Sequence, residues 1–159
     1  MATHVPVIAE AGADTPHRLL THLARANPHA DALDGAQTLT IFVGPHGYIS
    51  PSWYGQQPSV PTWNYAAVHV HGRAKRIADA VLLRDMLAQL VEGYEATQPK
   101  PWSMDELPAD YVDKMLNGIV GFEIAVERIE GKHKLDGDGC CSFGPGWSRG
   151  EGRQGKEEG

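Results

Sequence analysis

Apolar and polar residues alternate along three stretches of the chain, and a period of two residues is typical of β-strands. Residues 38–43 are β-branched and apolar, which favours a strand. Two longer strands are predicted for residues 63–77 and 118–135. Gly72 interrupts the first of these, and we expect a bulge or bend there.

Apolar residues at helical spacing predict two helices between the long strands. Asp79 is a candidate N-cap for a helix that runs to about Tyr94. A shorter helix is expected to begin near Pro108. The apolar stripe predicted for this second helix is Tyr111, Met115 and Ile119.

Residues 19–33 fit a strand through His22 that gives way to a short helix at Asn27-Pro28. The strands follow one another along the chain, with one helical pair inserted, and do not alternate regularly with helices. This order is a poor fit to a Rossmann sheet. We therefore predict a mainly β fold with peripheral helices (α+β), built as a small antiparallel barrel.

The composition changes after Leu135. Residues 136–159 are rich in glycine and have almost no apolar periodicity, which predicts a disordered tail behind a folded domain at residues 1–135. The adjacent Cys140 and Cys141 in this tail indicate no disulfide framework and fit a reducing compartment.

Charge and hydropathy narrow the function classes. With 14 Lys+Arg against 20 Asp+Glu the net charge is −6, which argues against broad affinity for nucleic acid. The chain has neither an apolar run of the roughly 20 residues that a membrane span needs nor a recognisable signal peptide. A cytoplasmic protein without membrane contact is expected.

Aromatic and hydroxyl-bearing residues gather at residues 44–55 and 60–65. Flat rings with hydrogen-bonding groups beside them suit a planar ligand. Trp53, Tyr54 and Trp63 equally fit a role in the core or in a dimer interface, and both interpretations stay open at this point.

The histidines raise the question of a metal site. His69 and His71 point to one face of a strand, and His22, His46 or His133 could supply a third ligand. No cysteine or carboxylate stands at a recognisable ligand spacing, however. A half-exposed sheet face is the favoured interpretation, and no metal is predicted.

Long motifs in this chain resemble those of a known family. The motifs are Gly44-Pro-His-Gly-Tyr-Ile-Ser-Pro-Ser-Trp-Tyr54, Val60-Pro-Thr-Trp-Asn-Tyr65, His69-x-His-Gly72 and Ile119-Val-Gly-Phe-Glu-Ile124, with further matches at 3–6, 23–28 and 128–135. Together they resemble the PaiB family, bacterial proteins described as FMN-binding negative transcriptional regulators. The resemblance implies a split β-barrel of the FMN-binding type, FMN as cofactor, and a homodimer with the flavin at its interface.

The resemblance also implies which residues bind the cofactor. Arg25 or Lys132 would meet the phosphate, Thr62 and Asn64 the polar atoms of the ring, and Trp53 or Trp63 its face. The full implied set is Thr3, His4, His22, Arg25, Asn27, Ser50, Trp53, Thr62, Trp63, Asn64, Lys132 and Lys134.

Two departures from the family pattern stand out. The chain begins part-way into the pattern, so we expect the first elements of the barrel to be missing and an edge to be exposed. After Leu135 the family's Ser-Gln-Asn continuation is replaced by Asp136-Gly-Asp-Gly.

Three functions fit this sequence. The first is an FMN-binding negative regulator of transcription, for which DNA binding is implied by the resemblance alone because no helix-turn-helix motif is recognisable. The alternative is a flavin-dependent oxidoreductase on the same scaffold, since fold does not settle function. Haem binding at a histidine is a third, weaker hypothesis.

Overall fold

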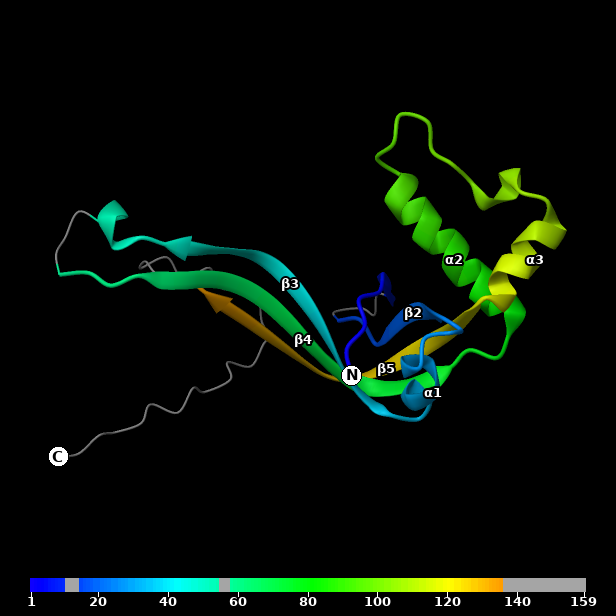
Figure 1. Cartoon of the computed structure of the whole chain (residues 1–159), viewed down its shortest axis with the longest axis horizontal. Coiled ribbons are helices and arrows are strands. Elements are labelled where there is room, and N and C mark those ends of the chain that lie inside the picture. Colours follow the sequence, from blue (N-terminus) through cyan, green and yellow to red (C-terminus); the bar gives the residue numbers. More distant parts are fainter. Residues whose placement is uncertain (11–14, 55–57, 136–159) are drawn as a thin grey trace. The chain divides into compact units, whose positions relative to one another are not determined.

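A computed structural model describes residues 1–10, 15–54 and 58–135 of the 159-residue chain (Figure 1). The strands are β1 (Val7–Glu10), β2 (Arg18–Ala24), β3 (Gln37–Ile49), β4 (Thr62–Arg76) and β5 (Ile119–Lys134). The helices are α1 (His29–Leu33), α2 (Ala80–Glu95) and α3 (Ala109–Asn117), with short 3₁₀ helices η1 (Pro51–Trp53) and η2 (Met104–Glu106).

The described strands form one sheet of order β1-β2-β5-β4-β3, in which β2 pairs antiparallel with both β1 and β5. The predicted strands at 63–77 and 118–135 are β4 and β5, and the one at 38–43 is part of β3, which continues to Ile49. The prediction of a mainly β fold with peripheral helices is confirmed. The tail at residues 136–159, with Cys140 and Cys141, lies outside the described residues.

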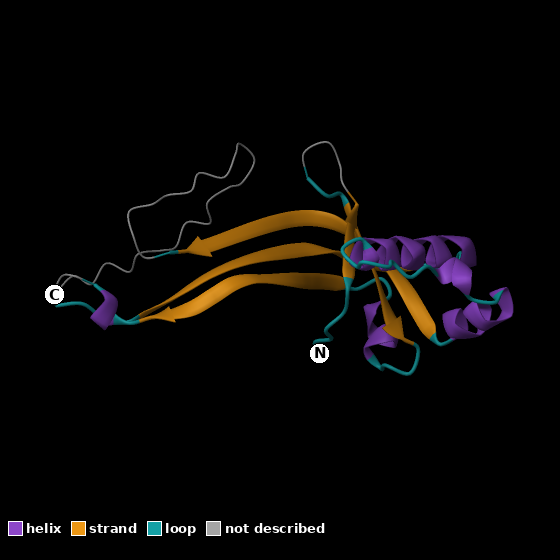
Figure 2. Cartoon of the chain, turned by 90° about the horizontal axis from the view of Figure 1, so that it is seen from above, coloured by secondary structure: helices purple, strands orange, loops and turns teal. Residues whose placement is uncertain are grey.

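The chain divides into two compact units, and the long strands belong to both. The first unit comprises residues 1–38 and 71–127, and the second comprises 39–70 and 128–159. The α-helices of the described residues all belong to the first unit, where Figure 2 shows them in purple beside its strands. None of the helices in the described ranges has the length and apolar character that a transmembrane segment requires.

The hydrophobic core lies in the first unit, around β2 and β5. Leu19 and Leu20 are neighbours on β2, point to opposite faces of the sheet and are both buried, so this strand is covered on both sides. Phe122 on β5 is completely buried. Helix α2 packs Leu83 and Met86 in the same core cluster as Leu20. Burying each large apolar side chain contributes about 1.5–3 kcal/mol, so this cluster fixes α2 on the sheet.

Helix α2 begins where the sequence predicts. The Asp79 carboxylate accepts hydrogen bonds from the backbone N–H groups of Val81 and Leu82, at 2.8 and 3.4 Å. Two of the N–H groups that a helix start leaves unpaired are thereby satisfied.

The predicted apolar stripe of α3 is wrong at two of its three positions. Tyr111 and Met115 are exposed, and Val112 is buried and Leu116 packs against the core instead. Both pairs have a spacing of four residues, so the helical period alone does not distinguish them. The packing of α3 against the rest of the first unit turns the Val112 side inward.

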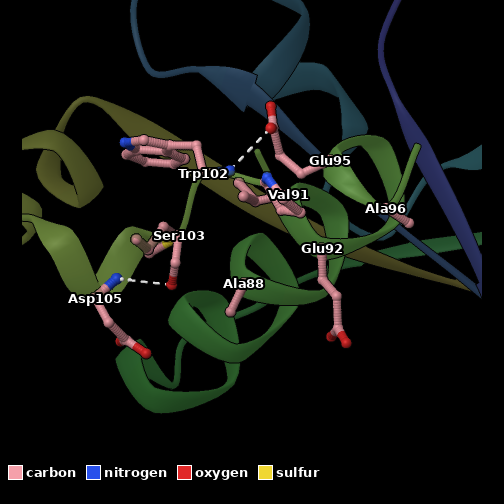
Figure 3. Close-up of a pocket in the computed structure, with 10 residues that line it drawn as sticks. Ala88, Val91, Glu92, Glu95, Ala96, Trp102, Ser103 and Asp105 are labelled. Carbon is pink, nitrogen blue, oxygen red and sulfur yellow. Dashed lines mark hydrogen bonds between the residues drawn. The ribbon is translucent and has the colours of Figure 1, made fainter. Parts of the chain in front are cut away.

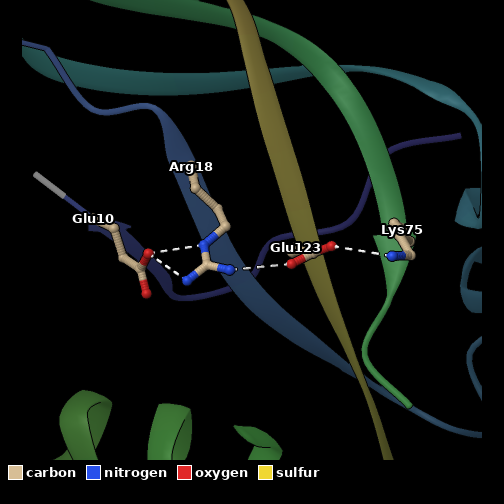
Figure 4. A network of polar contacts seen from close by, with 4 residues as sticks. All are labelled: Glu10, Arg18, Lys75 and Glu123. Carbon is tan, nitrogen blue, oxygen red and sulfur yellow. Dashed lines mark hydrogen bonds and ion pairs between the residues drawn. The ribbon is translucent and has the colours of Figure 1, made fainter. Parts of the chain in front are cut away.

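A row of charged side chains crosses four strands of the first unit (Figure 4). Arg18 on β2 contacts Glu10 on β1 at 2.6 Å and Glu123 on β5 at 3.2 Å, and Lys75 on β4 lies 3.7 Å from Glu123. Hydrogen bonding to the Glu10 carboxylate raises the pKa of Arg18, although partial burial opposes this shift. The alternation of charge along the row favours the observed strand order.

Strands β4 and β5 approach closely at Gly72. A Cβ atom built on Gly72 would lie 2.3 Å from the carbonyl oxygen of Ala125 and 2.8 Å from Cγ2 of Ile124. The residue therefore meets a steric requirement that only glycine satisfies.

We expect Gly72→Ala to lower the free energy of unfolding by about 1–3 kcal/mol, because backbone atoms cannot yield to the added methyl group. Gly93→Ala is the matched control, since Gly93 lies in α2 with open space around it. It should raise stability by up to about 1 kcal/mol through helix propensity. Urea denaturation of both variants measures the difference, and equal stabilities would contradict the steric account.

Candidate functional site

Two lysines near the end of β5 lie against side chains of β4 in the second unit. The Lys134 ammonium donates to the hydroxyl of Thr62, with 2.8 Å between Nζ and Oγ1. The Lys132 ammonium lies 5.7 Å from the centre of the Tyr65 ring. Both lysines are exposed, and an ammonium has three N–H donors, so each keeps donors for a ligand. Such a donor set suits a phosphate group.

Indole rings lie open to solvent in the same unit. Trp63 on β4 stacks on His46 of β3, with 5.8 Å between ring centres and 25° between ring planes, yet it is 50% exposed. Trp53, at the end of η1, is 68% exposed. Neither indole is a core residue within the described chain. Their exposure makes both indoles available to hold a planar ligand or to lie in an interface between chains.

Two further predicted residues of the second unit are only half-buried. The hydroxyl of Ser50 accepts a hydrogen bond from the Ser52 backbone N–H at 3.2 Å and lies 2.7 Å from the Ser52 hydroxyl, so it caps η1. Asn64 is half-buried on β4.

In the first unit, predicted residues hold the N-terminal segment to α1. The hydroxyl of Thr3 lies 2.9 Å from Nδ1 of His29 and accepts a longer hydrogen bond, 3.5 Å, from the Asn27 amide. The Asn27 side-chain oxygen also accepts from the His29 backbone N–H at 3.0 Å. His4 is exposed. The polar groups of Thr3 and Asn27 are thus engaged in local structure.

Arg25 is engaged at the end of α3. Its guanidinium donates to the carbonyl oxygens of Asn117 at 2.7 Å and Ile119 at 2.9 Å. A cation at a helix C-terminus is favourable because the last carbonyl groups carry partial negative charge. This contact gives Arg25 a structural role, and the predicted phosphate contact of Arg25 stays a prediction.

His22 is the one predicted residue with an orphaned buried atom in the described structure. Its Nδ1 is buried and has no hydrogen-bond partner there. Burial lowers the pKa of His22 below its ordinary 6.5, so the imidazole is neutral at pH 7. The first unit therefore contains a neutral imidazole whose buried nitrogen has no hydrogen-bond partner among the described residues.

The structure brings together some of the predicted residues and not others. Thr62 meets Lys134, and Thr3 meets Asn27, but the two pairs belong to different units. The sequence prediction missed Tyr65 and, as a ring partner, His46. Both residues lie within the aromatic segments at 44–55 and 60–65. The sequence therefore indicated the region but not the contacts of these rings with Lys132 and Trp63.

A metal site is not formed by the described residues. Among them no group of three His, Cys, Asp or Glu side chains could hold a metal ion. The set considered from sequence, which starts from His69 and His71, is therefore not assembled in this part of the chain.

Comparison with known proteins places the chain in a family. Residues 1–128 match the family model described as "Putative FMN-binding domain". The chain is 38% identical over 136 residues to "Protease synthase and sporulation protein PAI 2" of Bacillus subtilis, covering 85% of this chain and 64% of that protein. The chain belongs to the PaiB family. FMN, the predicted cofactor, is confirmed as the cofactor of this class of domain.

The chain is also similar to a yeast protein and, in fold, to a solved structure. An uncharacterized protein of Saccharomyces cerevisiae, YKL070W, is 36% identical over 105 residues, which are 62% of each chain. The structure of the flavocytochrome Anf3 from Azotobacter vinelandii superposes with a TM-score of 0.54 at 18% identity, covering 83% of this chain and 64% of that one. The predicted split barrel of the flavin-binding type is thereby confirmed as the fold. The chain spans about 64% of the length of the Bacillus protein.

Proposed function

We propose that this chain binds FMN through the second unit and acts as a flavin-binding negative regulator of transcription. The observation that carries the binding part is the exposed contact between Lys134 and Thr62, with Lys132 and the open indole of Trp63 in the same unit. The regulatory part is supported by the family's description.

The residues of the second unit fit the chemistry of FMN. Two ammonium groups and a hydroxyl can donate to a phosphate, and an exposed indole offers an apolar face to a tricyclic ring. FMN, when bound, supplies one- and two-electron redox chemistry. The side chains of Lys134 and Thr62 would hold its phosphate, and Trp63 would exclude water from one side of the ring.

We expect Lys134→Met to weaken FMN binding about tenfold or more, because hydrogen bonds to a charged group contribute about 1.5–3 kcal/mol. The matched control is Lys114→Met, which removes an exposed lysine of α3 that forms an ion pair with Asp110 on its own helix. Quenching of FMN fluorescence on titration gives both dissociation constants. Equal affinity in the two variants would remove Lys134 from the phosphate site.

The second unit also presents apolar surface that suits a second copy of the chain. Leu39, Ile41 and Val43 alternate along β3 and so share one face of it, and all three are exposed. Contiguous exposed apolar surface usually marks an interaction site. We infer a homodimer that covers this face and places FMN at the interface.

Ile41→Glu should convert the dimer to a monomer and weaken FMN binding with it, because a buried unpaired carboxylate is costly. Val81→Glu is the control, since Val81 is exposed on α2, outside the β3 face. Sedimentation velocity at several protein concentrations measures the oligomeric state. A wild-type chain that stays monomeric while it binds FMN would contradict the interface.

A flavin-dependent oxidoreductase is the second candidate, because the half-exposed indole of Trp63 would cover only one face of the ring and a reductant could reach the other face. The net charge of −6 makes extensive direct contact with DNA unfavourable. A regulator of this charge would act through a small basic surface or through another protein.

Two measurements separate the candidates. For a regulator, deletion of the gene should raise specific transcripts, the wild-type gene should restore them, and the Lys134→Met variant should fail to do so. The FMN absorbance should also persist under anaerobic NADPH. Rapid bleaching by NADPH with unchanged transcripts would establish the oxidoreductase instead.

A gel-shift series with salt tests direct DNA contact. If the chain binds DNA directly, its affinity for DNA must fall as salt is added.

A further inference from the structure

A hollow of about 530 Å³ opens in the first unit between α2 and residues 101–105 (Figure 3). None of its lining residues is among those proposed to bind FMN. Its volume is within the range of small-molecule sites in proteins, about 300–1,000 Å³.

One face of α2 forms the floor of this hollow. Ala88, Val91, Glu92 and Glu95 line it and recur at intervals of three and four residues, so they share one side of the helix. Ala88 contributes only a methyl group to this floor, so a longer side chain at this position would extend into the hollow.

The opposite wall is fixed by hydrogen bonds of its backbone. The Trp102 backbone N–H donates to the Glu95 carboxylate at 3.0 Å, which ties the wall to the helix. The Asp105 N–H donates to the Ser103 hydroxyl at 3.2 Å, at the start of η2. Figure 3 shows both bonds. The hollow is therefore formed before any ligand arrives, which lowers the entropic cost of binding.

The residues that line the hollow include acidic side chains and no basic one. Glu92, Glu95 and Asp105 line the hollow, and no lysine, arginine or histidine does. In Figure 3 the side chains of Glu92 and Asp105 lie on either side of Ala88, and neither carboxylate forms an ion pair with a described residue.

The indole of Trp102, 40% exposed, completes the surroundings. An aromatic ring attracts a cation to its face by about 0.5–2 kcal/mol, and carboxylates attract the same charge. Val91 and Met104 add apolar contact.

We propose that this hollow binds a small organic cation, namely a primary ammonium or guanidinium group on an apolar body. The carboxylates of Glu92 and Asp105 pair with the charge, and the indole of Trp102 and the side chain of Val91 cover the apolar part. The site is independent of the proposed flavin function.

The test uses the purified full chain labelled with ¹⁵N at low salt and phenethylamine as the probe. The indole N–H signal of Trp102, assigned by its loss in Trp102→Phe, should shift saturably with a dissociation constant of about 1 mM or tighter. Phenethyl alcohol and 3-phenylpropionate, the neutral and anionic analogues, should bind at least about tenfold more weakly.

Two variants distinguish the hollow from general surface charge. Ala88→Leu fills the space without changing charge and should abolish the shift, while the double variant Glu92→Gln, Asp105→Asn should weaken binding about tenfold. Glu106→Gln is the matched control, because Glu106 is exposed and adjacent to the hollow but does not line it. This variant should bind phenethylamine within about twofold of the wild-type affinity.

Each outcome decides the proposal once ¹H–¹⁵N spectra show that the variants are folded. No saturable shift with phenethylamine, equal binding of phenethyl alcohol, or an equal loss in Glu106→Gln would overturn it. FMN binding measured on the same samples reports separately on the flavin site, so failure of one proposal leaves the other distinguishable.

Discussion

The antiparallel pairing of β2 with β5 is the constraint on which the first unit depends. Its register sets Arg18 opposite Ala125 and Ala24 opposite Ile119, and both strands are buried along most of this length. Buried backbone N–H and C=O groups must be hydrogen-bonded. A shift of one residue would break this pairing between β2 and β5 and would also turn each side chain of the shifted strand to the other face of the sheet. The same register places His22 opposite Gly121, where an added Cβ atom would lie only 2.6 Å from Cδ1 of Leu83.

The two units use their polar residues differently. In the first unit, the groups of Thr3, Arg25 and Asn27 are engaged with the protein's own backbone and side chains. In the second unit, Lys134 makes one side-chain contact and remains exposed, and the indoles of that unit face solvent. Polar groups that already have hydrogen-bond partners within the protein contribute little to ligand binding. Exposed donors that still have free N–H groups can contribute more. The second unit is therefore the part of the chain better suited to bind FMN.

Much of the fold could be predicted from the sequence because local signals agreed with it. The long alternating runs and the Asp79 cap correspond to observed elements. The α3 stripe could not be predicted, because the pairs at 111/115 and 112/116 have the same spacing and only packing separates them. Likewise, the carbonyl partners of Arg25 lie 92 and 94 residues away, so no local pattern shows that its guanidinium is engaged.

Charge in this acidic chain is sorted rather than mixed at its two candidate ligand surfaces. The hollow beside α2 presents carboxylates without a cation, and the end of β5 presents Lys132 and Lys134 beside hydroxyl and aromatic groups of β4. An anion is repelled from the first surface and a cation from the second, and such repulsion contributes to specificity as much as attraction does. The two surfaces belong to different units, so the side chains that would select one ligand by charge are not those that would select the other.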